Sequence, residues 1–151
     1  MSEVKVIATN RRARHDYDIV DEFEAGLVLT GSEVKSMRAG KANLKDSFAH
    51  IRDGEMWLVG AYIGPYSYAR EGGHDPERSR KLLLHRHQID RIAGSLAEKG
   101  LTLVPMRLYF LDGKAKVHLG LGKGKRTIDK RADLRKREHQ REMDRARRRA
   151  R

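Results

Sequence analysis

The sequence contains no cysteine among its 151 residues, which excludes disulfides, thiolate metal ligands and cysteine nucleophiles. No apolar run approaches the roughly 18 residues that a membrane-spanning helix requires. The first residues also lack the apolar segment of a secretory signal. We therefore expect a cytoplasmic protein of one domain's size that does not bind membranes.

Motifs of catalysis and cofactor binding are missing as well. The glycine-rich run 120–126 is similar to a phosphate loop, but Leu119 stands where its first glycine belongs and Arg126 where Ser or Thr belongs. The seven histidines form no H-E-x-x-H motif, and no G-x-S-x-G occurs. We therefore predict no enzyme activity, no cofactor and no metal site. The glycine-rich run instead indicates a flexible basic strand end that approaches phosphates closely.

The chain carries a large and unevenly distributed positive charge. Lys and Arg number 33 against 21 Asp and Glu, a formal net charge of +12 that calls for a polyanionic partner. Residues 123–151 contain 14 Lys and Arg against 5 Asp and Glu, a net charge of +9, which leaves +3 for residues 1–122. The charge therefore divides the chain into a nearly balanced body, 1–122, and a basic tail, 123–151.

The tail contains too few apolar residues to form a core, so conformational entropy predicts that it is disordered when free. Opposite charges nevertheless stand four apart at Asp133 and Arg137 and at Asp144 and Arg148, a spacing that favours a helix. We interpret the tail as a coil that becomes helical on a phosphate surface. A tail that only keeps the protein in solution is the alternative.

The body is predicted to be mainly β. Residues 102–111 alternate between two faces, and the Asp-Gly that follows is typical of a hairpin turn. Three hairpins are expected, with the paired ranges 17–24 and 27–30, 47–52 and 55–63, and 102–111 and 114–121. Because free strand edges must be hidden, we expect a closed antiparallel barrel of the oligonucleotide-binding type, with a β-sandwich as the alternative.

Helical patterns are fewer. Apolar residues at helical spacing predict a helix over about 86–99, with Gly100 at its C-terminal end. A short helix is expected at 32–38, and residues 70–76 are expected to form a loop. The fold predicted is therefore a barrel with short flanking helices.

Glu33 stands out because a carboxylate on a phosphate-binding face costs Coulomb energy. It belongs there if it accepts hydrogen bonds from a base edge or orients a neighbouring Lys or Arg. The alternative is that it pairs with the dipole of a short helix. Spacing alone leaves both interpretations open.

Several long segments resemble the small protein B family, the bacterial SsrA-binding (tmRNA-binding) proteins. The matching segments, in family order, are 10–17, 26–36, 80–85, 103–105, 122–125 and 129–131. The resemblance implies an oligonucleotide-binding-type barrel that binds the tRNA-like domain of tmRNA and delivers it to stalled ribosomes. It also implies partners: the ribosome, with its small-subunit decoding centre and mRNA channel, and elongation factor Tu with GTP, engaged through tmRNA.

The resemblance assigns an RNA-binding role to the Gly-Ser-Glu-Val-Lys-Ser and Gly-Lys-Gly-Lys segments. With the basic clusters of the body, the candidate RNA-binding residues are Asn10, Arg11, Arg14, Glu33, Lys35, Arg38, Arg80, Lys81, His85, Lys123, Lys125 and Arg126. The resemblance also implies that the tail becomes helical in an empty mRNA channel. The candidate ribosome-binding residues of the tail are Ile128, Asp129, Lys130, Arg131, Arg135, Lys136 and Arg137.

One position departs from the family pattern. Ile128 stands directly before the Asp-Lys-Arg, where family members often carry an aromatic or imidazole ring, and an aliphatic side chain cannot stack as a π system. We expect the protein to be monomeric. The residues alone leave two alternatives to a tmRNA-binding protein. One is a ribosomal or general RNA-binding barrel protein, and the other is an RNA-modifying enzyme, for which the sequence offers no motif.

Overall fold

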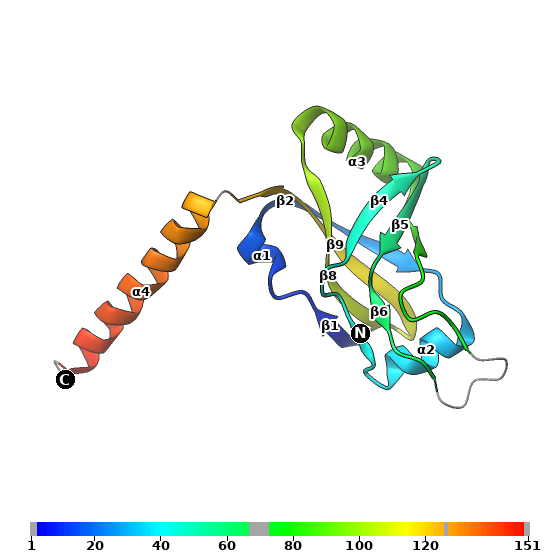
Figure 1. The fold of residues 1–151 in the computed structure, drawn as a ribbon, viewed down its shortest axis with the longest axis horizontal. Helices are drawn as coiled ribbons and strands as arrows, with labels where there is room; N and C mark the ends of the chain where they lie inside the picture. Colours follow the sequence, from blue (N-terminus) through cyan, green and yellow to red (C-terminus); the bar gives the residue numbers. More distant parts are fainter. Residues whose placement is uncertain (1–2, 67–72, 126, 150–151) are drawn as a thin grey trace.

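A computed structural model describes residues 3–66, 73–125 and 127–149 (Figure 1). The strands are β1 (Val4–Thr9), β2 (Tyr17–Leu27), β3 (Ala42–Asn43), β4 (Phe48–Arg52), β5 (Glu55–Val59), β6 (Tyr62–Ile63), β7 (Arg80–Leu83), β8 (Thr102–Leu111) and β9 (Lys114–Gly124). The helices are α1 (Ala13–Asp16), α2 (Gly31–Arg38), α3 (Arg86–Lys99) and α4 (Thr127–Arg149). The prediction of a mainly β protein with short helices is confirmed.

Seven strands form one antiparallel sheet in the order β1-β8-β4-β5-β7-β2-β9, and β8 also pairs with β9. The sheet therefore curves around a core. The contact between β4 and β8 is a single register pair, Ala49 with Leu103, whereas β8 and β9 pair along their length. Because this seam has no continuous ladder, the sheet is not a closed barrel and that prediction is wrong, while the oligonucleotide-binding type is not confirmed.

Local turn chemistry behaves as predicted at two hairpins. Asp53 and Gly54 have φ of 51° and 76°, and Asp112 and Gly113 have φ of 49° and 80°, the positive values that such two-residue turns require. The predicted helix over 86–99 is confirmed as α3, and Gly100 ends it in the left-handed conformation. The short helix is confirmed as α2.

The hairpin expected at Ala25-Gly26 is wrong. These residues lie inside one long strand, β2, where Ala25 is fully buried and Gly26 pairs with β7 on one side and β9 on the other. Core packing continues through the glycine, so the chain does not turn there. The long strand 55–63 is also wrong, because Gly60, with φ of 79°, separates β5 from β6.

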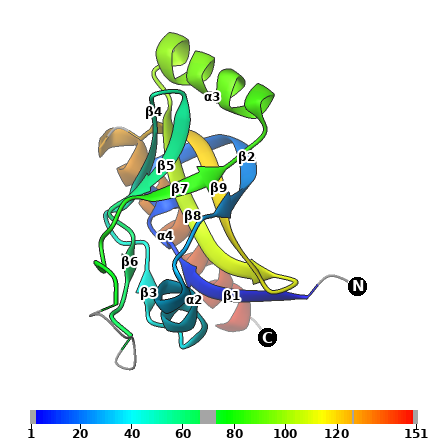
Figure 2. The same cartoon turned by 90° about the vertical axis from the view of Figure 1, so that its right-hand side faces the viewer.

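The core lies inside the curve of the sheet and includes Leu58, Leu108 and Leu119, none of which is exposed. Met37 of α2 and Ile92 of α3 join the same core. Figure 2 shows α3 at the top of the molecule and α2 near the bottom. The two helices therefore cover different ends of the curved sheet.

The basic tail continues from the end of β9. The strand extends through Gly124, two residues beyond the predicted body, and α4 then projects from the body (Figure 1). The helix α4 agrees with the helical spacing of the tail charges. The disorder of the tail in the free protein stays a prediction. Among the helices that the structure describes, none has the length and apolar character needed to cross a bilayer. The predicted loop 70–76 lies partly outside the described residues.

Gly122 of β9 serves packing rather than flexibility. A β-carbon at Gly122 would lie 2.9 Å from the carbonyl oxygen of Asp18 and 3.2 Å from the β-carbon of Tyr17. The same addition at Gly124 would meet nothing closer than 4.0 Å. The prediction of a flexible strand end is therefore wrong at Gly122, where the absent side chain lets β2 and β9 approach.

Gly122→Ala is expected to destabilise the protein by about 1–3 kcal/mol, because backbone and β-carbon atoms of β2 must move to admit the methyl group. Gly124→Ala, two residues along the same strand, is the matched control and is expected to change stability by less than about 1 kcal/mol. Urea unfolding followed by circular dichroism measures both. Equal effects of the two variants would contradict the packing argument.

Candidate nucleic-acid interface

A groove of about 460 Å³ lies between α1 with its preceding segment and the link from β3 to β4. Its lining includes the cationic side chains of Arg11, Arg12 and Lys45 and the ring of Phe48, all of which are exposed. Cations that neutralise phosphates beside a ring that stacks on a base are the combination that binds single-stranded nucleic acid. We take this as the candidate nucleic-acid groove.

Asn10 holds the first part of this groove in place. Its backbone N–H donates to the carbonyl oxygen of Met106 at 2.8 Å, and its side-chain amide donates to that of Pro105 at 2.9 Å. Three residues on, Ala13 is buried against β8. Asn10 is thus a positioning residue for the two arginines that follow it, and its amide group is already bonded within the protein.

The end of β9 lies beside α1. Lys123 pairs in register with Asp18 of β2, and the backbone N–H of Lys125 donates to the carbonyl oxygen of Asp16 at 2.8 Å. The side chain of Lys123 is exposed, whereas that of Lys125 is only 12% exposed and lies 3.8 Å from the Asp18 carboxylate. The structure therefore brings Lys123 to the end of the body that carries the groove.

Glu33 is fully buried and is the acceptor for three groups. The backbone N–H of Thr30 donates to it at 2.9 Å, and the guanidinium groups of Arg78 and Arg80 each donate at 2.5 Å. Burial alone would raise the pKa of Glu33, but these hydrogen bonds and the Arg80 charge hold it at about 2. The carboxylate is therefore ionised, and both of its oxygens accept hydrogen bonds from groups within the protein.

Arg80 is as fully buried as Glu33, and its remaining N–H groups donate to the carbonyl oxygens of Ala61 at 2.6 Å and Pro76 at 3.0 Å. Burial lowers the pKa of Arg80, and its hydrogen bond to Glu33 opposes that shift. The expectation that Glu33 and Arg80 contact RNA directly is wrong for this conformation, because neither reaches the surface. Of the roles considered for Glu33, its position excludes a contact with a base edge. It fits two others, the capping of a short helix and the orientation of neighbouring arginines.

The other candidates lie apart from the groove. Lys35 and Arg38 are exposed on α2, Lys81 forms an ion pair with Glu55 at 3.2 Å, and His85 begins α3. Arg14 is exposed on α1 and pairs with Glu22 at 2.9 Å.

The tail candidates are described only in part. Arg126 lies outside the described residues. The side chains of Ile128, Asp129, Lys130, Arg131 and Lys136 also lie outside the described part, although their backbone belongs to α4. Arg135 and Arg137 are exposed on that helix.

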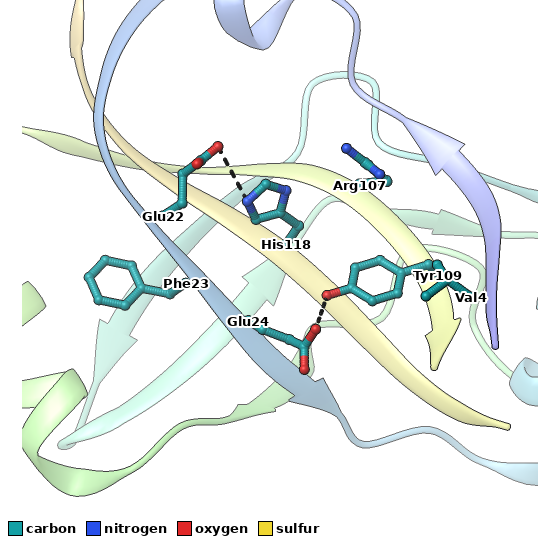
Figure 3. Close-up of a pocket in the computed structure, with 7 residues that line it drawn as sticks. All are labelled: Val4, Glu22, Phe23, Glu24, Arg107, Tyr109 and His118. Atoms are coloured by element: carbon teal, nitrogen blue, oxygen red, sulfur yellow. Dashed lines mark hydrogen bonds and ion pairs between the residues drawn. The ribbon is translucent and has the colours of Figure 1, made fainter. Parts of the chain in front are cut away.

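A second groove, of about 430 Å³, lies on the outer face of β2, β8 and β9 (Figure 3). His118 lies 3.3 Å from Glu22, and the Tyr109 hydroxyl donates to Glu24 at 2.5 Å. Burial, with the hydrogen bond to Glu24, raises the pKa of Tyr109. Arg107 is exposed beside them.

This second groove combines carboxylate acceptors with guanidinium and imidazole groups, which suits the polar edge of a base. Sequence reasoning missed it because the glutamates counted only as negative charge. The strand register supplies the missing information, since Glu24 pairs with His118 and His118 pairs with Arg107. The alternation of polar and apolar residues in β8 and β9 indicated one polar face. It did not indicate that β2 lies beside them.

Comparisons with known proteins agree along nearly the whole chain. The family model described as SmpB protein matches residues 7–149. An SsrA-binding protein of Syntrophobacter fumaroxidans is 52% identical over 149 residues, 99% of this chain and 92% of the relative. One from Kineococcus radiotolerans is 58% identical over 142 residues, 94% of this chain and 91% of the relative.

A solved structure is also similar, with a TM-score of 0.66 and 50% identity. The match covers 84% of this chain and 93% of that one, which is described as "tmRNA-SmpB: a journey to the center of the bacterial ribosome".

Glu33→Gln is expected to lower the free energy of unfolding by about 3 kcal/mol at neutral pH, because it leaves the buried Arg80 without its counter-charge. The pKa of Glu33 is about 2 in the folded protein, below its ordinary value of 4.5 in an unfolded chain, so the stabilisation is present above pH 4.5 and lost as the pH falls toward 2. Urea unfolding from neutral to acid pH should show the difference between the two proteins shrinking over that range.

Glu55→Gln is the matched control for this measurement. Glu55 also pairs with a cation, Lys81, but its side chain is 48% exposed, so its loss is expected to cost less than about 1 kcal/mol. A difference between wild type and Glu33→Gln that stays constant down to acid pH would contradict the assignment of an ionised, stabilising carboxylate.

Proposed function

The chain belongs to the SmpB protein family, and on that basis we propose that it binds tmRNA and acts in trans-translation. The protein binds the tRNA-like domain of tmRNA and delivers it to stalled ribosomes, where the nascent peptide is tagged and the ribosome is released. It acts as a binding protein and not as an enzyme. The observation that carries the proposal is the match of relatives named SsrA-binding proteins over 94% or more of this chain.

The body supplies the tmRNA-binding part. Arg11, Arg12 and Lys45 line a groove that also contains the exposed ring of Phe48, and Lys123 lies at the same end. Cations at these positions neutralise phosphates, while shape and ring contacts select an irregular RNA fold over a plain duplex. The remaining body, with a formal charge of only +3 over residues 1–122, contributes little unspecific attraction.

The tail supplies the ribosome-binding part. It is disordered when free and helical in an empty mRNA channel, so that it senses the absence of a codon. The helical backbone of α4 supports the second state. The proposed contacts to ribosomal RNA are Ile128, Asp129, Lys130, Arg131, Arg135, Lys136 and Arg137.

The proposal includes the setting in which the protein works. It is a monomeric cytoplasmic protein that meets elongation factor Tu with GTP through tmRNA. Its body is of the oligonucleotide-binding type, which the strand pairings of β4, β5, β7, β2, β9 and β8 support, since each of these strands pairs with the next.

Removing the residues after Lys130 is expected to leave the affinity for the tRNA-like domain within about threefold at physiological salt, because none of the α4 side chains that the structure describes belongs to the core. Peptide tagging in a reconstituted translation system is expected to be abolished. Binding is measured by gel shift and tagging by the appearance of tagged product. If the shortened protein lost RNA affinity in proportion to its lost charge, the division of labour would be wrong.

Arg12→Ala is expected to weaken binding of the tRNA-like domain and to reduce the slope of log K against log salt by about 1, the value for one lost phosphate contact. Lys5→Ala removes the same charge from β1, where Lys5 is exposed away from the groove, and serves as the control. Fluorescence anisotropy at several salt concentrations measures both. An equal slope in the two variants would show that Arg12 acts only through net charge.

A further inference from the structure

The outer face of β4, β5 and β7 carries a row of large side chains that the core does not use. Phe48 pairs in register with Val59, and His50 pairs with Trp57, which in turn pairs with Lys81. Side chains two apart on a strand share a face, so these residues lie side by side on the sheet. The alternate residues of the same strands, such as Met56, Leu58 and Leu82, are buried.

The rings on this face differ in their exposure, and that of Phe48 is the most open to solvent. Phe48 is 46% exposed, and its ring lies 5.8 Å from that of His50 in a stacked arrangement. Trp57, the only tryptophan of the chain, is partly exposed. One exposed ring with two partly exposed rings on the same face of the sheet provides π surfaces on which unpaired bases stack, whatever their identity.

Cations border the rings. The Lys81 side chain is 40% exposed at the end of the row formed by His50 and Trp57. The Arg52 side chain, two residues beyond His50 on β4, is 76% exposed. Each cation lies beside an exposed carboxylate, Lys81 at 3.2 Å from Glu55 and Arg52 at 4.0 Å from Asp53. A nucleotide strand stacked on the rings would therefore exchange these surface ion pairs, which are weak, for contacts to its phosphates.

The same charges argue against a protein partner. Arg52, Lys81 and Glu55 would lose water at the centre of a protein interface, where charged side chains are depleted. An RNA strand instead places its negative phosphates near the cationic groups of Arg52 and Lys81. The favoured occupant is therefore nucleic acid and not a second copy of the chain.

This face is continuous with the candidate nucleic-acid groove. Phe48 lines that groove together with Arg11 and Arg12, and it is also the first residue of the exposed face. A strand that leaves the groove past Phe48 therefore meets Trp57 and Lys81 next. The groove and the face form one path.

We propose that the outer face of β4, β5 and β7 binds unpaired nucleotides of the RNA, with bases stacked on Phe48 and Trp57 and phosphates near Arg52 and Lys81. The inference rests on the proposed RNA-binding function and adds a stacking surface for single-stranded RNA. It predicts that the protein holds unpaired nucleotides next to the structured part of its RNA.

The single tryptophan makes the proposal testable with the full chain. An unpaired oligouridine about 12 nucleotides long is titrated against wild type, and base stacking is expected to quench Trp57 emission on binding. Phe48→Ala is expected to weaken oligouridine binding about tenfold, the loss of one stacked base. The exposed side chain makes this substitution compatible with folding, which circular dichroism verifies.

Val6→Ala is the control, because Val6 is 47% exposed on β1 and lies outside the groove and the face. Wild-type affinity in Val6→Ala together with weakened binding in Phe48→Ala supports the proposal. Binding of oligouridine with unchanged Trp57 emission, or equal affinities of the two variants, overturns it. The proposal is also overturned if Phe48→Ala changes the sedimentation of the protein but not its affinity for RNA. The face would then be a contact between copies of the chain.

A second titration with the tRNA-like domain separates this inference from the proposed function. If that RNA binds wild type tightly while oligouridine neither binds nor quenches, the stacking face is wrong and the proposed function stands. If neither RNA binds, the proposed function is wrong and the stacking face falls with it.

Discussion

A buried carboxylate, Glu33, joins parts of the chain that are far apart in sequence. It caps α2 through Thr30 and accepts hydrogen bonds from Arg78 and Arg80, which come from the segment leading into β7. Arg80 in turn donates to the carbonyl oxygen of Ala61 beside β6. One ionised group therefore fixes a helix, a connecting segment and a strand against each other, and the exposed residues of α2 and β7 depend on it for their positions.

Local chemistry made part of the fold predictable. The Asp-Gly pairs at 53–54 and 112–113 marked hairpins because few other residues adopt positive φ at low cost, and apolar spacing over 86–99 marked α3. Ala25-Gly26 failed as a turn because the same small residues also suit a crowded strand between two neighbours. Only the tertiary partner distinguishes these cases.

The candidate site was predictable in composition more than in arrangement. Sequence identified the cations near Arg11, but not that Asn10 holds that segment to β8 or that Phe48 lies beside them. Sequence spacing did not distinguish the possible roles of Glu33. Its two arginine partners lie 45 and 47 positions away in the sequence, so neither they nor its burial can be read from its neighbours. The groove around Glu24 and His118 likewise depends on strand register, which composition does not contain.

The two-residue gap between Gly124 and Thr127 confines the origin of the tail to the end of β9, which pairs with β2 and β8. A helix of 23 residues measures about 35 Å, whereas the same segment fully extended reaches about 80 Å. In the proposed free state, a coil anchored at this point has the longer of these two reaches. On the proposed transition from coil to helix, the reach of the tail shortens by tens of ångströms, so folding on its RNA surface would bring the attached body closer to that surface.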